Sequence, residues 1–130
     1  MSVDAKTAGS IYSLPGSIVS FTAGANITKG QLVKVTGAMT VSPAAAATDP
    51  VIGVAVTSAS QGSQVSVLVG CPIVWVTAGG AISAGAAVGS DASARAVAVT
   101  TAGNRALGYA LEAASAAGEI IRVAVNPHVY

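Results

Sequence analysis

The side chains that could carry out chemistry are few in this sequence, and they stand far apart. The chain has five carboxylates, a single histidine, His128, and a single cysteine, Cys71. The carboxylates are Asp4, Asp49, Asp91, Glu112 and Glu119. No two of them share a short motif or a helical face, so the sequence offers no general acid–base pair. Metal centres need clustered His, Cys or carboxylate ligands, and the sequence has no such cluster. We therefore expect no catalytic residue, no metal site and no cofactor.

Motifs that bind phosphate or build a nucleophile are also missing. The glycine-rich stretch GGAISAGAAVGS, which begins at Gly79, lacks the Lys-Ser/Thr ending of a phosphate-binding loop. The sequence has no G-x-S-x-G, and Cys71 has no histidine near it in sequence. The glycines are better interpreted as turn positions and Cys71 as a small apolar residue. We expect a protein that is not an enzyme and has no small-molecule substrate.

Charge is scarce, and the basic residues are scattered. Charged residues make up 8% of the chain, against about 25% in an average soluble domain, and the net charge is +1. Nucleic acids and anionic membranes attract clustered Lys and Arg, so neither is an expected partner. Residues 51–90 carry no charge, but Ser, Gln, Gly and Pro interrupt them too often for a membrane helix. The first ten residues lack the apolar core of a secretory signal. A surface this poor in charge indicates that other protein covers much of it.

The chain contains an internal repeat. Five short patterns recur in the same order at offsets of 55 to 58 residues. They are 27–30 with 82–85, 39–41 with 97–99, 51–55 with 106–110, 58–62 with 115–118, and 65–69 with 121–125. Val65, Val67 and Val69 alternate with other residues, which is typical of a strand with one buried face. Short runs of this kind separated by Gly-, Asn- and Ser-rich turns predict an all-β barrel or sandwich.

These patterns predict one β domain over residues 17–130, made of two similar units of about 55 residues at approximately 25–79 and 80–127. Residues 1–16 lie outside both units and are expected to form an extended N-terminal arm. Residues 42–50 are interpreted as a surface loop bounded by prolines. Residues 111–117 have helical propensity but are too short for a stable helix, so they are expected to form a turn or one helical turn.

Trp75 is the single tryptophan and lies in the apolar run PIVWV. It is a candidate for the core or for an oligomer interface. The alternative is a residue that stacks on sugar, which would make the chain a glycan- or receptor-binding β module. An exposed Trp75 in a groove would favour that alternative, and a buried one would disfavour it.

The order of these segments resembles a known family. The relevant residues are PGSIVSFTA at 15–23, ITKGQLV at 27–33, IGVA at 52–55, the hairpin at Gly62, the strand at 65–69, ISAG at 82–85, LGYA at 107–110 and VAV at 123–125. They are similar, over roughly residues 14–127, to the capsid decoration, or cement, proteins of tailed double-stranded DNA phages. The alanine-rich loop at 42–50 and the scarcity of acidic residues depart from that family's pattern.

The resemblance implies a structural virion protein, made in the host cytoplasm, that binds the exterior of the phage head; the alternative is a glycan- or receptor-binding β module of a phage tail or fibre. Such a protein stabilises the head by bridging subunits of the major capsid protein, and it is expected to be a homotrimer. An extended segment can add a strand to the edge of a partner's sheet, so the arm is the candidate capsid contact. The candidate contact residues are Ile11, Tyr12, Leu14 and Pro15.

Overall fold

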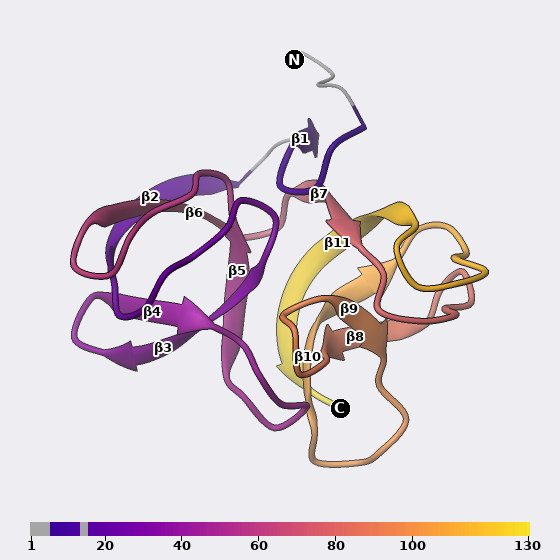
Figure 1. Ribbon diagram of the computed structural model, residues 1–130. Coiled ribbons are helices and arrows are strands. Elements are labelled where there is room, and N and C mark those ends of the chain that lie inside the picture. Colours follow the sequence, from indigo (N-terminus) through magenta and orange to yellow (C-terminus); the bar gives the residue numbers. More distant parts are fainter. Residues whose placement is uncertain (1–5, 14–15) are drawn as a thin grey trace.

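The computed structural model describes residues 6–13 and 16–130, which fold into strands and turns (Figure 1). The strands are β1 (Ile11–Ser13), β2 (Ser17–Ala23), β3 (Leu32–Gly37), β4 (Thr40–Pro43), β5 (Val51–Ala55), β6 (Gln64–Val69), β7 (Ile73–Thr77), β8 (Ala87–Ser90), β9 (Ala96–Ala98), β10 (Arg105–Ala110) and β11 (Ile120–Val129). The predicted all-β class is confirmed. Within the described ranges, no helix has the length and hydropathy needed to cross a bilayer.

The first half of the chain forms a closed five-stranded barrel in the order β2-β4-β3-β5-β6. The parallel pair β2–β4 closes it, and the other neighbouring strands are antiparallel. Alternate side chains point inward, as the period of a strand requires. The interior is filled by Ala23, Ile27, Val33, Val41, Ala55, Val65 and Val67. Small and β-branched side chains suit the narrow interior of a barrel with so few strands.

The second half repeats this topology. Its strands follow the order β7-β11-β10-β8-β9, which matches β2-β6-β5-β3-β4 of the first barrel. A parallel bridge between Ala78 and Ala96 stands where Ala23 pairs with Val41 in the first barrel. The equivalent interior positions hold Ala78, Ile82, Val88, Ala96, Ala110, Ile121 and Val123, all of them buried. The chain is therefore a closed barrel beside a second sheet with the same strand arrangement, which is called the second barrel below (Figure 1).

Strand pairing fixes the register of the repeat. Val33 pairs with Gly53, and 55 positions later Val88 pairs with Gly108. Two of the sequence matches are shifted by two or three residues: the counterpart of Val41 is Ala96 rather than Val99, and the bridges at 27–59 and 82–114 make Ala114 the counterpart of Ala59. Alternating Ala and Val allow such slips because they look alike at neighbouring registers.

The loops that look ambiguous in sequence are turns. Pro43 ends β4, and the following loop is held by Asp49, whose carboxylate accepts the N–H groups of Ala45 and Ala46 and the Lys34 ammonium at 3.0 Å. Burial opposes ionisation of Asp49, but these donors outweigh it and lower its pKa. Residues 111–117 form bends and a turn, without a helical turn, and Glu119 accepts N–H groups from Ser115 and Ala116.

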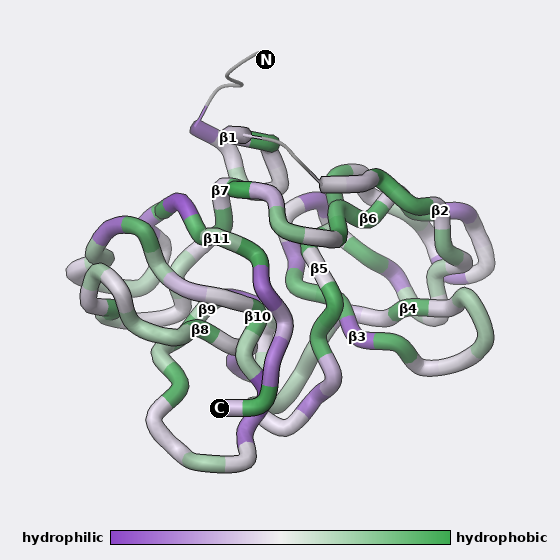
Figure 2. The backbone as a smooth tube through the Cα atoms, turned by 180° about the vertical axis from the view of Figure 1, so that it is seen from behind, coloured by the Kyte–Doolittle hydropathy of each residue, from purple (hydrophilic) through white to green (hydrophobic). Residues whose placement is uncertain are grey.

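The two barrels meet at an apolar seam. Leu32, Val54 and Leu68 lie opposite one another on three neighbouring strands and point out of the first barrel, yet all three are fully buried. They belong to the same apolar cluster as the interior of the second barrel, and β5 contacts both β10 and β11. Figure 2 shows hydrophobic positions along β5 between the two barrels. The shared cluster makes the two barrels one body.

Gly53 and Gly108 occupy equivalent positions where neighbouring strands come too close for a side chain. A Cβ at Gly108 would fall on the Ala124 carbonyl oxygen, and one at Gly53 on the Leu68 carbonyl oxygen. Backbone cannot yield as a flexible side chain can, so we expect Gly108→Ala to lower the free energy of unfolding by about 3 kcal/mol. Gly80→Ala is the matched control, because no atom lies within 4 Å of the position that a Cβ would take there. Urea denaturation of both variants measures the difference, and equal midpoints would contradict this packing.

Candidate functional site: the N-terminal strand and its seat

The N-terminal segment is joined to the second barrel by backbone pairing. Strand β1 pairs antiparallel with β7, with Ile11 opposite Val74 and Ser13 opposite Ile73. The Gly9 N–H donates to the Trp75 carbonyl at 2.8 Å, and the Trp75 N–H donates to the Ser10 carbonyl at 3.0 Å. β1 is the terminal strand of its six-stranded sheet. The segment thus extends the second barrel's sheet by one strand.

Residues 8–10 also touch the first barrel. Gly9 and Ser10 are buried, and a Cβ on Gly9 would meet the Ala55 carbonyl oxygen and the Gly30 nitrogen at 2.8 Å. Gly9 has a φ of +84°, which disfavours other residues there as well. Figure 1 shows β1 above the junction of the two barrels. The segment therefore reaches β7 along the seam.

The surface that β1 covers, called the seat here, consists of Trp75, Arg122 and Glu112, and Trp75 lies at its centre. Its neighbours Val74 and Val76 belong to the apolar core, so strand alternation turns Trp75 to the outer face of the sheet. It is nevertheless only 7% exposed. Tyr12 packs edge-on against it, with ring centroids 5.8 Å apart and planes at 87°, and the Lys6 ammonium lies 5.5 Å from its ring. The buried indole N–H has no hydrogen-bond partner among the described residues.

Arg122 binds the two aromatic rings together. Its guanidinium lies 4.9 Å from the centre of the Tyr12 ring and 5.1 Å from that of Trp75, within range of a cation–π interaction. Glu112 holds it in place by accepting from Nε at 2.8 Å, and the same carboxylate accepts the Arg122 backbone N–H at 2.9 Å. The Arg122 guanidinium keeps the pKa of Glu112 below its ordinary value, and Glu112 raises the pKa of Arg122. The seat therefore carries a charge pair that is ionised at neutral pH.

The structure assigns different surroundings to the sequence-predicted site residues. Ile11 is half-buried and packs against the core of the second barrel, and Tyr12 is half-buried on Trp75. Leu14 and Pro15 lie outside the described residues. The burial of Trp75 disfavours the interpretation as a sugar-stacking platform. Arg122 and Glu112 were not predicted, because ten residues and a turn separate them and neither belongs to a recognisable motif.

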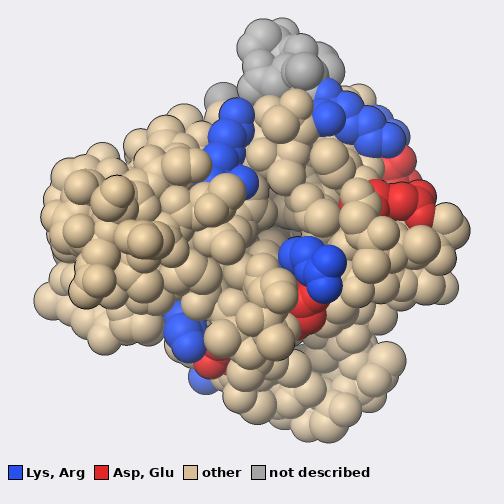
Figure 3. Space-filling view, viewed as in Figure 1, with Lys and Arg blue, Asp and Glu red and all other residues tan. Residues whose placement is uncertain are grey.

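The site holds β1 against β7, and its charged residues Lys6, Arg122 and Glu112 lie against Trp75 or pair with one another. In the described part of the chain, no three His, Cys, Asp or Glu residues stand close enough to hold a metal ion. Figure 3 shows the few charged side chains separated by wide uncharged surface. A pair of barrels with a clamped terminal strand defines the scaffold.

Comparison with known proteins identifies the scaffold's family. The sequence matches the phage cement protein family over residues 14–126, and the chain belongs to that family. It is a structural protein of the phage virion, of the kind that decorates capsids. No curated protein matches the sequence. Among solved structures, the N base of the head fibre protein gp8.5 of bacteriophage phi29 has the same fold, with a TM-score of 0.67 at 22% identity, over 86% of this chain and 95% of that one.

The seat predicts a fluorescence response to loss of Tyr12. Tyr12→Ala uncovers the single tryptophan, so its emission should shift to longer wavelength, and stability should fall by about 1–2 kcal/mol from the lost aromatic contact and buried area. Tyr109→Ala is the control, because Tyr109 is 41% exposed and stacks on His128 instead. An unchanged spectrum in Tyr12→Ala would show that Tyr12 does not cover Trp75.

The seat also predicts a dependence on acid. Because the pKa of Glu112 is lowered in the folded state, its stabilisation is complete above the ordinary value of 4.5 and is lost as the pH falls through the folded-state value. Glu112→Gln should therefore be less stable than the wild type at neutral pH, and the difference should shrink as the pH drops below 4.5. Thermal melts of both proteins between pH 7 and pH 3 measure this. A difference that stays constant with pH contradicts the assignment.

Proposed function

We propose that the protein binds the outer surface of the phage head and stabilises it by bridging neighbouring subunits of the major capsid protein. The observation that carries the proposal is the family match over residues 14–126. The protein is made in the host cytoplasm, acts without catalysis, and has neither nucleic acid nor membrane as a partner. The charge content of 8% supports this, because a surface covered by protein needs little charge for solubility.

Bridging requires a body that transmits force and touches several subunits. The apolar cluster shared by the two barrels supplies rigidity, since residues of both barrels contribute to it. A homotrimer supplies several contacts at once, so each can be weak while the assembly stays bound. About 800 Å² on each partner is enough for a specific interface. We expect the trimer to be visible by light scattering in solution or on the shell.

The N-terminal region is the proposed capsid contact. β1 is the last strand of its sheet, and a terminal strand can accept a strand from a partner through main-chain hydrogen bonds. Ile11 and Tyr12 pack against β7 and Trp75, so they fix the position of β1 on the sheet. Leu14 and Pro15, the next residues along the chain, are the proposed anchors on the shell.

The test uses expanded shells that lack a decoration protein. The wild type should co-sediment with these shells and raise the temperature at which they open. Leu14→Asp should bind at least tenfold more weakly, because a charge replaces an apolar anchor. A deletion of residues 2–14 is less informative, since it also removes β1 and uncovers Trp75.

Two results decide between the parts of this proposal. If the wild type neither sediments with shells nor protects them, the capsid-binding function is wrong. If the wild type binds and Leu14→Asp binds equally well with an unchanged melting temperature, the N-terminal contact is wrong while the function stands.

A further inference from the structure

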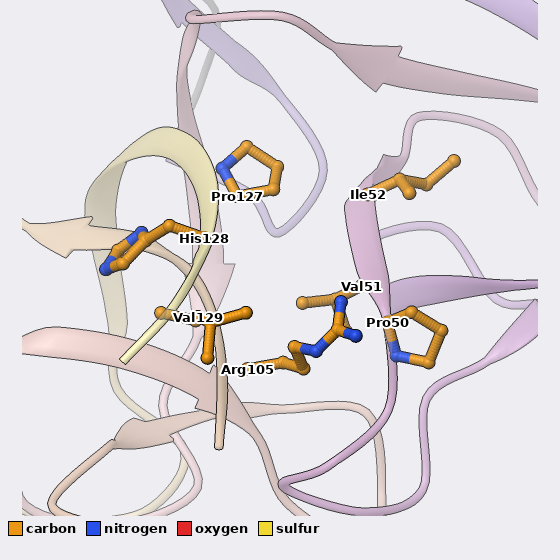
Figure 4. Close-up of a pocket in the computed structure, with 8 residues that line it drawn as sticks. Pro50, Val51, Ile52, Arg105, Pro127, His128 and Val129 are labelled. Carbon is orange, nitrogen blue, oxygen red and sulfur yellow. The ribbon is translucent and has the colours of Figure 1, made fainter. Parts of the chain in front are cut away.

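A groove of about 210 Å³ lies between the two barrels, on the side where β11 ends. One wall is the start of β5, with Pro50, Val51 and Ile52, and the other consists mainly of Arg105, Pro127 and Val129 (Figure 4). The lining is apolar apart from Arg105 and His128. The volume falls below the 300–1,000 Å³ of typical small-molecule sites, so the groove suits one or two side chains of a polypeptide.

Arg105 is a cation without a carboxylate partner among the described residues. Lys34, Arg95 and Arg122 each form an ion pair with a carboxylate, and Lys6 lies over Trp75. Within residues 6–13 and 16–130, neither Arg105 nor Lys29 forms such a pair. Figure 4 shows the Arg105 guanidinium extending across the groove toward Val51. The groove therefore offers an unpaired guanidinium to a partner's carboxylate. A guanidinium matches a carboxylate well, because it can donate two parallel hydrogen bonds to the two oxygens.

Both walls are strands with one side unpaired in the described structure. β6 pairs with β5 only at Val54 and Ala55, so Val51 has a strand partner on the β3 side alone, and its N–H donates to the Asp49 carbonyl. β7 pairs with β11 as far as Ala124, and the Val125 N–H donates to the Pro72 carbonyl, so beyond Val125 β11 has β10 alone as its strand neighbour. An extended chain entering the groove can therefore pair with the main chain at the end of β11.

We propose that this groove binds an extended, apolar segment of the capsid protein that carries a carboxylate, with Arg105 pairing to that carboxylate. The identity of the partner rests on the proposed function. The positive charge of Arg105 favours an acidic residue in the segment, and the Val and Pro lining favours apolar residues beside it. Pro50 and Pro127 have no N–H group, which limits the registers in which a strand can pair here. The contact is separate from the N-terminal strand, so it gives each protomer a second attachment to the shell.

His128 does not supply the pairing charge. Its ring stacks on Tyr109 with centroids 5.1 Å apart, and its Nδ1 lies 2.7 Å from the Asn126 carbonyl oxygen. These contacts hold the imidazole beside the groove, whereas Arg105 reaches into it (Figure 4). The Arg105 side chain can be changed without disturbing the strands, because the Arg105 backbone N–H keeps its bond to the Ala47 carbonyl.

The first experiment measures binding to expanded, undecorated shells by co-sedimentation. Arg105→Gln should bind about tenfold more weakly than the wild type, as expected for loss of one charge-assisted contact, with an unchanged melting temperature. Lys29→Gln is the matched control: it removes the other unpaired cation of the described residues, which does not line the groove, and should bind within twofold of the wild type. Equal binding by Arg105→Gln and wild type, or equal losses in both variants, overturns the proposal.

A second experiment separates this inference from the capsid function. The probe is the peptide acetyl-Thr-Val-Glu-Val-Thr-amide, added to ¹⁵N-labelled protein, with the Gln form of the peptide as its control. The Glu peptide should shift the amide signals of Val51, Ile52 and Val129 and bind about tenfold tighter than the Gln peptide. If neither peptide shifts these signals, or both bind equally, the groove is not an acidic-segment site, whether or not the protein binds shells.

Discussion

The row of Leu32, Val54 and Leu68 is the contact on which the molecule depends. These side chains point out of a barrel whose interior is already filled, and the second barrel buries them completely. Without that cover, the first barrel would expose a contiguous apolar row to water, at about 25 cal/mol for each Å². The seam therefore makes each barrel necessary to the other, although each has its own interior.

The seam also explains how the N-terminal segment is placed. Gly9 fits where the Ala55 carbonyl and Gly30 come close, and the chain then continues as β1 onto β7. Without the N-terminal segment, the Trp75 side chain would be exposed to solvent on the outer face of the sheet. Tyr12, Lys6 and the Arg122–Glu112 pair cover it with cations over its ring and an aromatic edge. The Lys34–Asp49 and Arg122–Glu112 ion pairs each tie a loop to a strand, and the Arg95–Asp91 pair lies within the turn between β8 and β9.

The sequence predicts the class and the repeat well because both depend on local alternation. Val65, Val67 and Val69 need no distant partner to indicate a strand, and the Ile27 and Ile82 motifs mark equivalent turns. What it does not predict depends on contacts between remote segments. Arg122 meets Tyr12 only because β11 and β1 flank β7, and a full strand order is needed to see this. The closed first barrel, the seam and the position of Arg105 at a groove between β5 and β11 likewise follow from topology. Alternating Ala and Val do not encode that topology, because they look alike at neighbouring registers.

The central claim is that a rigid pair of barrels joins capsid subunits by binding more than one of them. Electron cryomicroscopy of shells decorated with the wild-type protein tests it directly. We predict density for both barrels in the relative arrangement described above, with each assembly touching at least two capsid subunits. Density that contacts a single subunit, or barrels that are displaced from one another at the seam, would contradict it.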